Sequence, residues 1–336
     1  MPTKTATALT GLGAFAIAMA ALTPTVAAPA LKKAPLKEDV TTHSRSSAQI
    51  LNAATGELEP ATVELQRHLT TAHGKNGKAL GSSSTAAYQE VLTLTRVGAD
   101  GTATTIDARG RFIGLTASQG VMAFDRATGV GKVGVDGETY HTTGQIVKFP
   151  FNTKKGTYQY YDQTSGKAWP VTYTRSTTID GLSVYEFKGT VPEQHLGQYG
   201  VLPNTDEIYS NAGRTVLVEP KTGEIVSSTT APQISIKFAD GSVKQALLID
   251  SLVPTAATVK DRVDMAKSDK RKLSMLSAAP WALGALGVIL LGLAFGLGRR
   301  RAAQGELPAT RPDVSGALPT PRTEPAADPA KAKTRS

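Results

Sequence analysis

Aromatic side chains gather in one stretch of this sequence. Nine of the chain's 19 aromatic residues lie between Phe149 and Phe187. Tyrosine and tryptophan rings offer a flat apolar surface with a polar edge, so an exposed group of them can bind a glycan or a lipid. Tyr158, Tyr160 and Trp169 are the candidates for such a ligand-binding aromatic face. The alternative is that these rings pack across neighbouring strands and form a core.

Motifs for catalysis or metal binding are missing from the sequence. The chain has no cysteine, which excludes thiolate nucleophiles, cysteine-based metal sites and disulfides. The five histidines are scattered, and the spacing of His68 and His73 places them on different faces of a strand or a helix. No G-x-S-x-G nucleophile motif occurs. We therefore predict no catalytic residue, no metal site and a protein that is not an enzyme.

Two further patterns have simple explanations. Residues 129–134 spell G-x-G-x-x-G, but a dinucleotide site needs this loop between a strand and a helix, whereas here it joins two turn signals. The carboxylates of Asp125, Glu186 and Glu219 fit exposed turn and strand positions. We therefore predict no cofactor.

The net charge of +9 is not concentrated in a basic patch. Residues 32–272 carry 28 Lys and Arg against 24 Asp and Glu, and residues 299–336 carry eight against four. No basic stripe interleaved with aromatic residues is present. This pattern argues against nucleic acid as a partner.

Turn motifs recur through residues 32–254 and predict the elements that hold these side chains. Four pieces share one pattern: NAATG at 52–56, DRATG at 125–129, DQTSG at 162–166 and EPKTG at 219–223. The first side chain can cap the turn, less readily for glutamate, and the glycine can take a left-handed conformation. Asp-Gly pairs at 100, 136, 180 and 240 add tight hairpin turns.

The segments between these turns are short and rich in β-branched and aromatic residues, as at 91–95, 184–187 and 215–218. Several alternate apolar with polar, as antiparallel strands do when one face is wet. We predict an all-β antiparallel domain over residues 32–254, either a sandwich or a curved meander sheet. Short strands interrupted by Asp and Lys do not suit a membrane β-barrel.

The C-terminal part predicts a membrane anchor. Residues 277–298 carry no charge and, at about 1.5 Å per residue, are long enough for a helix to cross the hydrocarbon layer. Trp281 near one end and the arginines at 299–301 favour a cytoplasmic tail, residues 299–336, which is rich in Pro and Ala and predicted to be disordered. An apolar helical face over residues 255–276 predicts a helical stalk.

The N-terminal residues 1–31 contain a second apolar segment after Lys4. This segment is either a cleavable signal peptide or an uncleaved signal anchor. Both alternatives export residues 32–254, so we expect one or two transmembrane helices, a protein in the cytoplasmic membrane and a main domain outside it.

Gly292 and Gly296 form a G-x-x-x-G spacing in the predicted membrane helix. Small residues at this spacing let helices approach closely, so the two glycines are candidates for helix packing in a homo-oligomer or against a membrane protein partner. The alternative is that small residues are simply frequent in membrane helices.

Three stretches are similar to the PorA-type actinobacterial membrane protein family, a domain of unknown function with a porin label. They are residues 149–170, which contain FPF, YQYYD, DQTSG and WP, residues 214–223, RTVLVEPKTG, and residues 125–129, DRATG. The order of an N-terminal membrane segment, an exported domain and a closing membrane helix also matches. The chain departs from the family pattern in its short, Thr-rich N-terminal segment and its long tail.

These observations predict a membrane-anchored cell-envelope protein. The leading hypothesis is non-enzymatic binding or scaffolding of an envelope lipid, glycan or protein at the lipid bilayer. The alternative, which the family's label implies, is a subunit of an oligomeric porin or channel. A third and less favoured hypothesis is an enzyme of the cell envelope.

Overall fold

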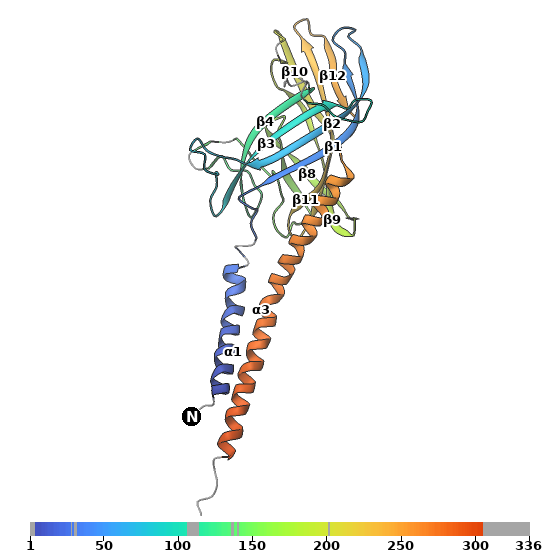
Figure 1. The fold of residues 1–336 in the computed structure, drawn as a ribbon. Helices are drawn as coiled ribbons and strands as arrows, with labels where there is room; N and C mark the ends of the chain where they lie inside the picture. Colours follow the sequence, from blue (N-terminus) through green and yellow to red (C-terminus); the bar gives the residue numbers. More distant parts are fainter. Residues whose placement is uncertain are drawn as a thin grey trace, which may run out of the picture.

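The computed structural model describes residues 4–27, 29, 32–105, 114–135, 138–139, 141–200 and 202–304. One large sheet stands on a long C-terminal helix, and an N-terminal helix lies beside that helix (Figure 1). The helical elements are α1 (Lys4–Leu22), the π-helical turn η1 (Thr23–Ala27) and α3 (Ala256–Gln304). The strands are β1 (Asp39–Leu51), β2 (Leu58–Thr71), β3 (Thr85–Arg96), β4 (Thr116–Asp125), β5 (Gly134–Val135), β6 (Glu138–Thr139), β7 (Thr157–Asp162), β8 (Lys167–Ile179), β9 (Leu182–His195), β10 (Thr205–Glu219), β11 (Glu224–Phe238), β12 (Val243–Ile249) and β13 (Val253–Pro254).

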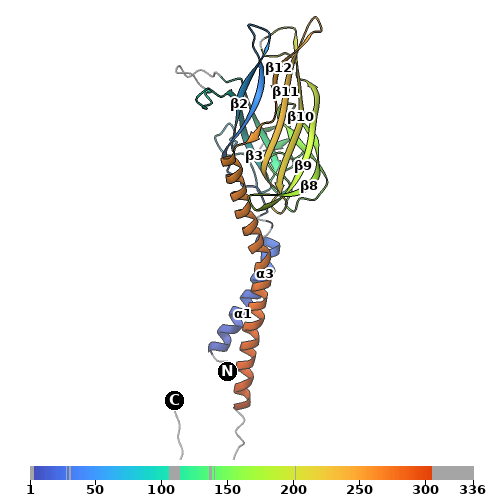
Figure 2. The same cartoon turned by 90° about the vertical axis from the view of Figure 1, so that its right-hand side faces the viewer.

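The main sheet is two meanders joined side by side. Its strand order is β4-β3-β2-β1-β12-β11-β10-β9-β8-β7, all antiparallel, with β13 paired to β1. The sheet curls into a half-barrel, as the crossing of β1–β4 over β8–β11 shows (Figures 1 and 2). The prediction of an antiparallel all-β domain is confirmed, and of the two architectures considered the curved meander sheet is the one that forms.

The segment 141–149 lies between the two edge strands, β4 and β7. The amide of Gly131, which follows β4, donates to the carbonyl of Gly144 at 2.7 Å, and the amide of Tyr161 in β7 donates to the carbonyl of Gln145 at 2.8 Å. Edge strands carry unpaired backbone donors and acceptors. The segment accepts hydrogen bonds from backbone amides at both edges, so it spans the open side of the half-barrel.

The predicted turns form where the motifs place them. The amides of Ala54 and Ala127 donate to Asn52 Oδ1 and Asp125 Oδ1 at 2.9 and 3.0 Å. The four motif glycines, at 56, 129, 166 and 223, have φ between 66° and 78°. The Asp-Gly pairs at 180 and 240 join β8 to β9 and β11 to β12, and the pair at 136–137 lies outside the described residues.

Two of the carboxylates that were expected at exposed positions, those of Glu186 and Glu219, are buried. Glu219 is fully buried, and its Oε2 accepts from the Thr222 amide at 2.8 Å, so it caps its turn much as aspartate does. Glu186 is 5% exposed and its Oε2 accepts from Arg175 Nη2 at 3.0 Å. The prediction of exposure was wrong for both because each carboxylate has a cationic partner from another element.

The strands are longer than predicted. β10 and β11 have 15 residues each, and β2 has 14. The short apolar segments are pieces of these strands, and the polar residues between them lie on a strand face rather than at a break. Register shifts between Asn211 and Arg214 and between Leu217 and Val218 mark irregularities that bend β10.

The predicted stalk and membrane helix are one continuous helix, α3. Its apolar face packs on the sheet, where Val263 and Ala266 are buried against Val184 and Val226. The helix runs past the predicted boundary at residue 298 to Gln304. The disorder of the tail stays a prediction, and residues 305–336 lie outside the described part of the chain.

Helix α1 packs against the apolar half of α3 (Figures 1 and 2). The spans Lys4–Val26 and Ala256–Leu297 are long and apolar enough to cross a membrane. The helices meet at Gly13 and Gly287, where a Cβ on Gly287 would lie only 2.8 Å from the carbonyl oxygen of Gly13. A Cβ on Gly292 or Gly296 would have nothing within 4 Å. Packing of those two glycines in an oligomer stays a prediction.

Disulfide cross-linking can test the α1–α3 contact because the chain has no native cysteine. A Cβ on Gly284 would lie 4.0 Å from Cβ of Ala20, a separation that a disulfide bridges. We expect Ala20→Cys/Gly284→Cys to cross-link within one chain on mild oxidation, as mass spectrometry of the digested full-length protein would detect. Ala20→Cys/Gly292→Cys is the control and should not. Loss of α1 from the mature protein, or equal bridging in the control, would contradict the helix pair.

Candidate functional site

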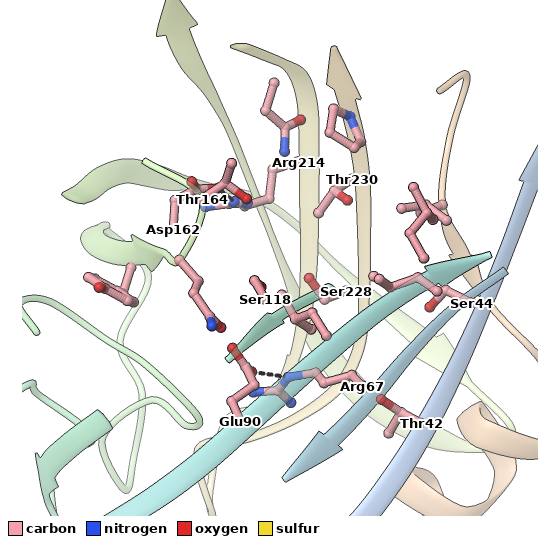
Figure 3. A pocket seen from close by; sticks show the side chains of 18 of the residues that line it. Thr42, Ser44, Arg67, Glu90, Ser118, Asp162, Thr164, Arg214, Ser228 and Thr230 are labelled. Atoms are coloured by element: carbon pink, nitrogen blue, oxygen red, sulfur yellow. Dashed lines mark hydrogen bonds and ion pairs between the residues drawn. The ribbon is translucent and has the colours of Figure 1, made fainter. Parts of the chain in front are cut away.

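The concave face of the half-barrel holds a cavity of about 510 Å³ (Figure 3). Its lining comes from both meanders and from the first turns of α3, which contribute Thr258 and Arg262. Alternation along the strands explains the lining, since Glu90, Leu92 and Leu94 of β3 all face inward. Pockets for small ligands commonly have volumes of about 300 to 1,000 Å³, so this cavity is large enough to bind one.

The wall of the cavity combines apolar and hydroxyl side chains. Leu65, Leu92 and Leu247 are part of the apolar surface. Hydroxyl groups make up much of the rest of the wall. Figure 3 shows those of Thr42, Ser44, Ser118, Ser228 and Thr230 around the cavity. Such a surface suits a ligand that is apolar in one part and polar in another.

A first charged pair lies on the cavity wall. Arg67 Nε of β2 donates to Glu90 Oε1 of β3, and Glu90 is only 4% exposed (Figure 3). Burial alone would lower the pKa of Arg67, but the Glu90 carboxylate raises it above its usual range. Arg67 therefore stays charged, and its ion pair with Glu90 balances the charge on that part of the wall.

A second charged pair lies deeper, between Asp162 and Arg214. Arg214 Nη2 donates to Asp162 Oδ2. Arg214 is 6% exposed and Asp162 is 4% exposed. The Tyr209 hydroxyl donates to the same carboxylate oxygen at 2.9 Å. Burial, with a contribution from Asp162, raises the pKa of Tyr209, so the hydroxyl keeps its proton. The ring of Tyr160 faces the guanidinium, and the distance from the ring centroid to Arg214 Cζ is 5.2 Å.

Local sequence positions both members of this second pair. Asp162 opens the DQTSG turn, where its Oδ1 accepts from the Ser165 amide at 2.8 Å while Oδ2 faces Arg214. Arg214 follows the bulge in β10 and shares an inward face with Val216 and Val218, both fully buried. Sequence analysis missed Arg214 as a site residue. The sequence signal that could have found it is the spacing: Arg214 lies two and four residues before the valines at 216 and 218, so on a strand it shares their buried face.

The three predicted aromatic residues do not lie together at the cavity. Tyr160 lines it. Tyr158 packs against Phe149, with 5.0 Å between ring centroids, and belongs to the core cluster at that end of the sheet. Trp169 pairs with Tyr160 across β7 and β8, and its Nε1 donates to Ser165 Oγ at 3.0 Å. Among the described residues only Tyr160 of the three joins the lining, and binding by the other two stays a prediction.

Ion pairs attach α3 to the sheet beside the cavity. Arg262 Nη2 lies 2.7 Å from Glu224 Oε1, and Lys270 Nζ lies 3.1 Å from Oε1 of the buried Glu219. Lys221 Nζ of the EPKTG turn donates to Ser274 Oγ at 2.8 Å. These contacts hold the first half of α3 against the sheet. They thereby also fix the position of Thr258 and Arg262, which line the cavity.

Lys148 is a buried cation on the segment 141–149, which also lines the cavity. It is 4% exposed, and its ammonium lies 3.3 Å from the ring centroid of Phe151. Burial lowers the pKa of Lys148 to about 8, because the surroundings disfavour the charged form. The nearby Glu224 and Asp125 carboxylates offset only part of that effect.

The fold and cavity define a class of protein: an all-β half-barrel with a ligand-sized cavity, carried by two helices apolar enough to span a membrane. The family model for Porin PorA matches residues 5–295 of the chain. The chain therefore belongs to the PorA family, as the motifs predicted. A relative named Porin PorA, from Corynebacterium amycolatum, is 24% identical over 213 residues, which cover 47% of this chain and 54% of the relative. The match thus spans about half the length of that relative.

The Asp162–Arg214 pair predicts a large stability difference between single and double variants. Asp162→Asn keeps an oxygen for the turn but leaves the Arg214 charge buried without its carboxylate, which should destabilise the protein by about 3 kcal/mol or more. Asp162→Asn/Arg214→Met removes both charges and should recover much of this loss. Denaturant unfolding of the full-length protein in detergent measures the difference. Additive losses in the double variant would show that the two side chains do not interact.

Lys148 predicts that stability rises with pH. Its folded pKa is about 8 against an ordinary 10.5, so between those values the unfolded chain binds a proton that the folded chain has lost. The free energy of unfolding then increases with pH over that window, by about 2 kcal/mol from about pH 7.5 to about pH 9.5. Lys148→Met should lack this increase in thermal unfolding followed by tryptophan fluorescence. Lys75→Met, at an exposed turn lysine, should keep it, and an unchanged pH dependence in Lys148→Met would be contrary to the assignment.

Proposed function

We propose that this protein binds an amphiphilic envelope lipid in the half-barrel cavity and does not catalyse a reaction. The observation that carries the proposal is the cavity of about 510 Å³, whose wall joins apolar side chains, hydroxyl groups and a buried arginine. Binding sites for small molecules are concave, mostly apolar and equipped with a few polar groups. The cavity has each of these properties.

The two helices support a location at the cytoplasmic membrane, with the half-barrel outside it. Trp281 is 82% exposed near the sheet-proximal end of the apolar part of α3, and arginines follow at its other end, at 299–301. Aromatic residues favour the membrane interface and basic residues favour the cytoplasmic side. In this placement the cavity lies above the outer surface of the bilayer, where lipid can enter it.

Filling the cavity tests the proposal. Leu92 of β3 lines the cavity, whereas its neighbour Val91 faces the opposite side of the sheet. We expect Leu92→Trp to reduce the lipid that co-purifies with the full-length protein in nanodiscs by at least about fivefold, and Val91→Trp to leave it unchanged. Native mass spectrometry measures the bound lipid. Equal lipid content in both variants and the wild type would refute binding in the cavity.

The second candidate function is a subunit of an oligomeric porin. The name of the family and of its relative supports it. So does the outer face of α3, where Gly292 and Gly296 have open space around them and Val288 and Ile289 are 65% and 58% exposed. Small residues beside exposed aliphatic ones can pack against another copy of the helix.

Planar bilayer recording tests the porin function. The full-length protein should conduct, and Gly292→Leu or Gly296→Leu should abolish conductance because the larger side chain separates neighbouring helices. Both positions are open within one chain, so neither change should disturb the fold, which circular dichroism would check. Reproducible silence of the wild-type chain would rule this function out.

A further inference from the structure

The Arg214 guanidinium has more donors than the protein has acceptors for it. Nη2 binds Asp162, but Nε and Nη1 are buried and have no hydrogen-bond partner among the described residues. Buried N–H groups, above all charged ones, are normally paired, and leaving them unpaired is unfavourable. An acceptor within the cavity would remove that cost.

The neighbours of Arg214 do not accept from its Nε or Nη1. Asp162 already accepts from the Tyr209 hydroxyl at 2.9 Å and from the Ser165 amide at 2.8 Å. Tyr160 covers a face of the guanidinium with its ring, 5.2 Å away. A cation over a ring leaves the in-plane N–H groups available to other partners.

The other cations of the cavity lining are occupied by carboxylates. Arg67 binds Glu90, and Arg262 binds Glu224 at 2.7 Å. Gln163, next to Asp162 in the lining, also has a buried Oε1 without a donor among the described residues. The Arg214 end of the cavity therefore combines unpaired donors with one unpaired acceptor. Glu207 is a further carboxyl group of the lining and has no ion-pair partner among the described residues, and burial raises its pKa.

We propose that Arg214 binds the oxyanion headgroup, a carboxylate or a phosphate, of an amphiphile whose apolar chain lies along the aliphatic wall. When the headgroup is a monoprotonated phosphate, its remaining P–O–H group can donate to Gln163 Oε1. This inference rests on the proposed function, because it names the class of ligand for the same cavity. Arginine suits the role, since its planar guanidinium donates several hydrogen bonds to oxyanions and remains charged.

The test compares ligands that differ only in the headgroup. Full-length protein in nanodiscs is titrated with hexadecanoate, hexadecyl phosphate, hexadecanol and inorganic phosphate, and binding is measured by native mass spectrometry. The wild type should bind the two anionic amphiphiles at least about tenfold more tightly than hexadecanol, the gain expected for hydrogen bonds to a charged group. Inorganic phosphate should bind far more weakly, because it lacks the apolar chain.

Variants at Arg214 identify the group responsible. Arg214→Lys keeps the charge for Asp162 but loses the unpaired guanidinium donors, so the affinity for hexadecanoate should fall about tenfold while that for hexadecanol stays unchanged. Asp162→Asn/Arg214→Met, which leaves no buried charge unpaired, should behave in the same way. Arg175→Lys is the matched control, since its ion pair with Glu186 involves an exposed arginine away from the cavity lining, and it should bind both ligands like the wild type.

The outcomes separate this inference from the proposed function. Failure of every amphiphile to bind would refute both. Equal affinity of the wild type for hexadecanoate and hexadecanol, or an equal loss of both in Arg214→Lys, would overturn the headgroup site and leave lipid binding intact. Inorganic phosphate binding as tightly as hexadecyl phosphate would overturn the amphiphile in favour of a free anion.

Discussion

The pairing of β1 with β12 is the contact on which the rest of the structure depends. It joins the meander β1–β4 to the meander β7–β12, with Ala48 opposite Ile249 and Ile50 opposite Leu247. Ala48, Leu247 and Ile249 are buried there with Val63 and Leu94, and each large aliphatic side chain contributes about 1.5 to 3 kcal/mol on burial. Without this junction the two meanders would have no common concave face, and the cavity would not exist.

Charge burial is the second constraint on the half-barrel. A charge taken out of water is stable only when it is paired and hydrogen-bonded. Arg67 with Glu90 and Arg262 with Glu224 meet this requirement with one carboxylate each. Arg214 meets it only in part, because Asp162 binds one of its three guanidinium nitrogens. This imbalance between donors and acceptors is what distinguishes one end of the cavity as a site for an anion.

The continuity of α3 links the cavity to the apolar helix pair. Thr258 and Arg262 near its start line the cavity, while Gly287 farther along packs against Gly13 of α1. Between these points Lys270 binds the buried Glu219. A stalk held to the sheet by side chains fixes the angle between the half-barrel and the apolar helix pair, which a flexible linker would not do. Any displacement of α3 must therefore also move residues of the cavity wall.

Local interactions explain what the sequence by itself determined. The turn motifs, the antiparallel strands and the two apolar helices depend on residues within a few positions of one another, so their patterns can be read directly. The family resemblance rests on the same motifs and was confirmed over residues 5–295. The length of the strands was underestimated, because polar residues that face a cavity look like breaks in a strand.

Only the tertiary structure decided the curl of the sheet, the cavity and its charges. Asp162 and Arg214 lie on different strands, and their contact depends on the bulge in β10 and on how β7–β10 curve. Tyr158, Tyr160 and Trp169 look alike in sequence, yet only Tyr160 of these three reaches the cavity. Likewise, Gly287 rather than Gly292 faces α1, because the rotation of α3 is set by its packing on the sheet. These features come from non-local contacts, which no short sequence pattern encodes.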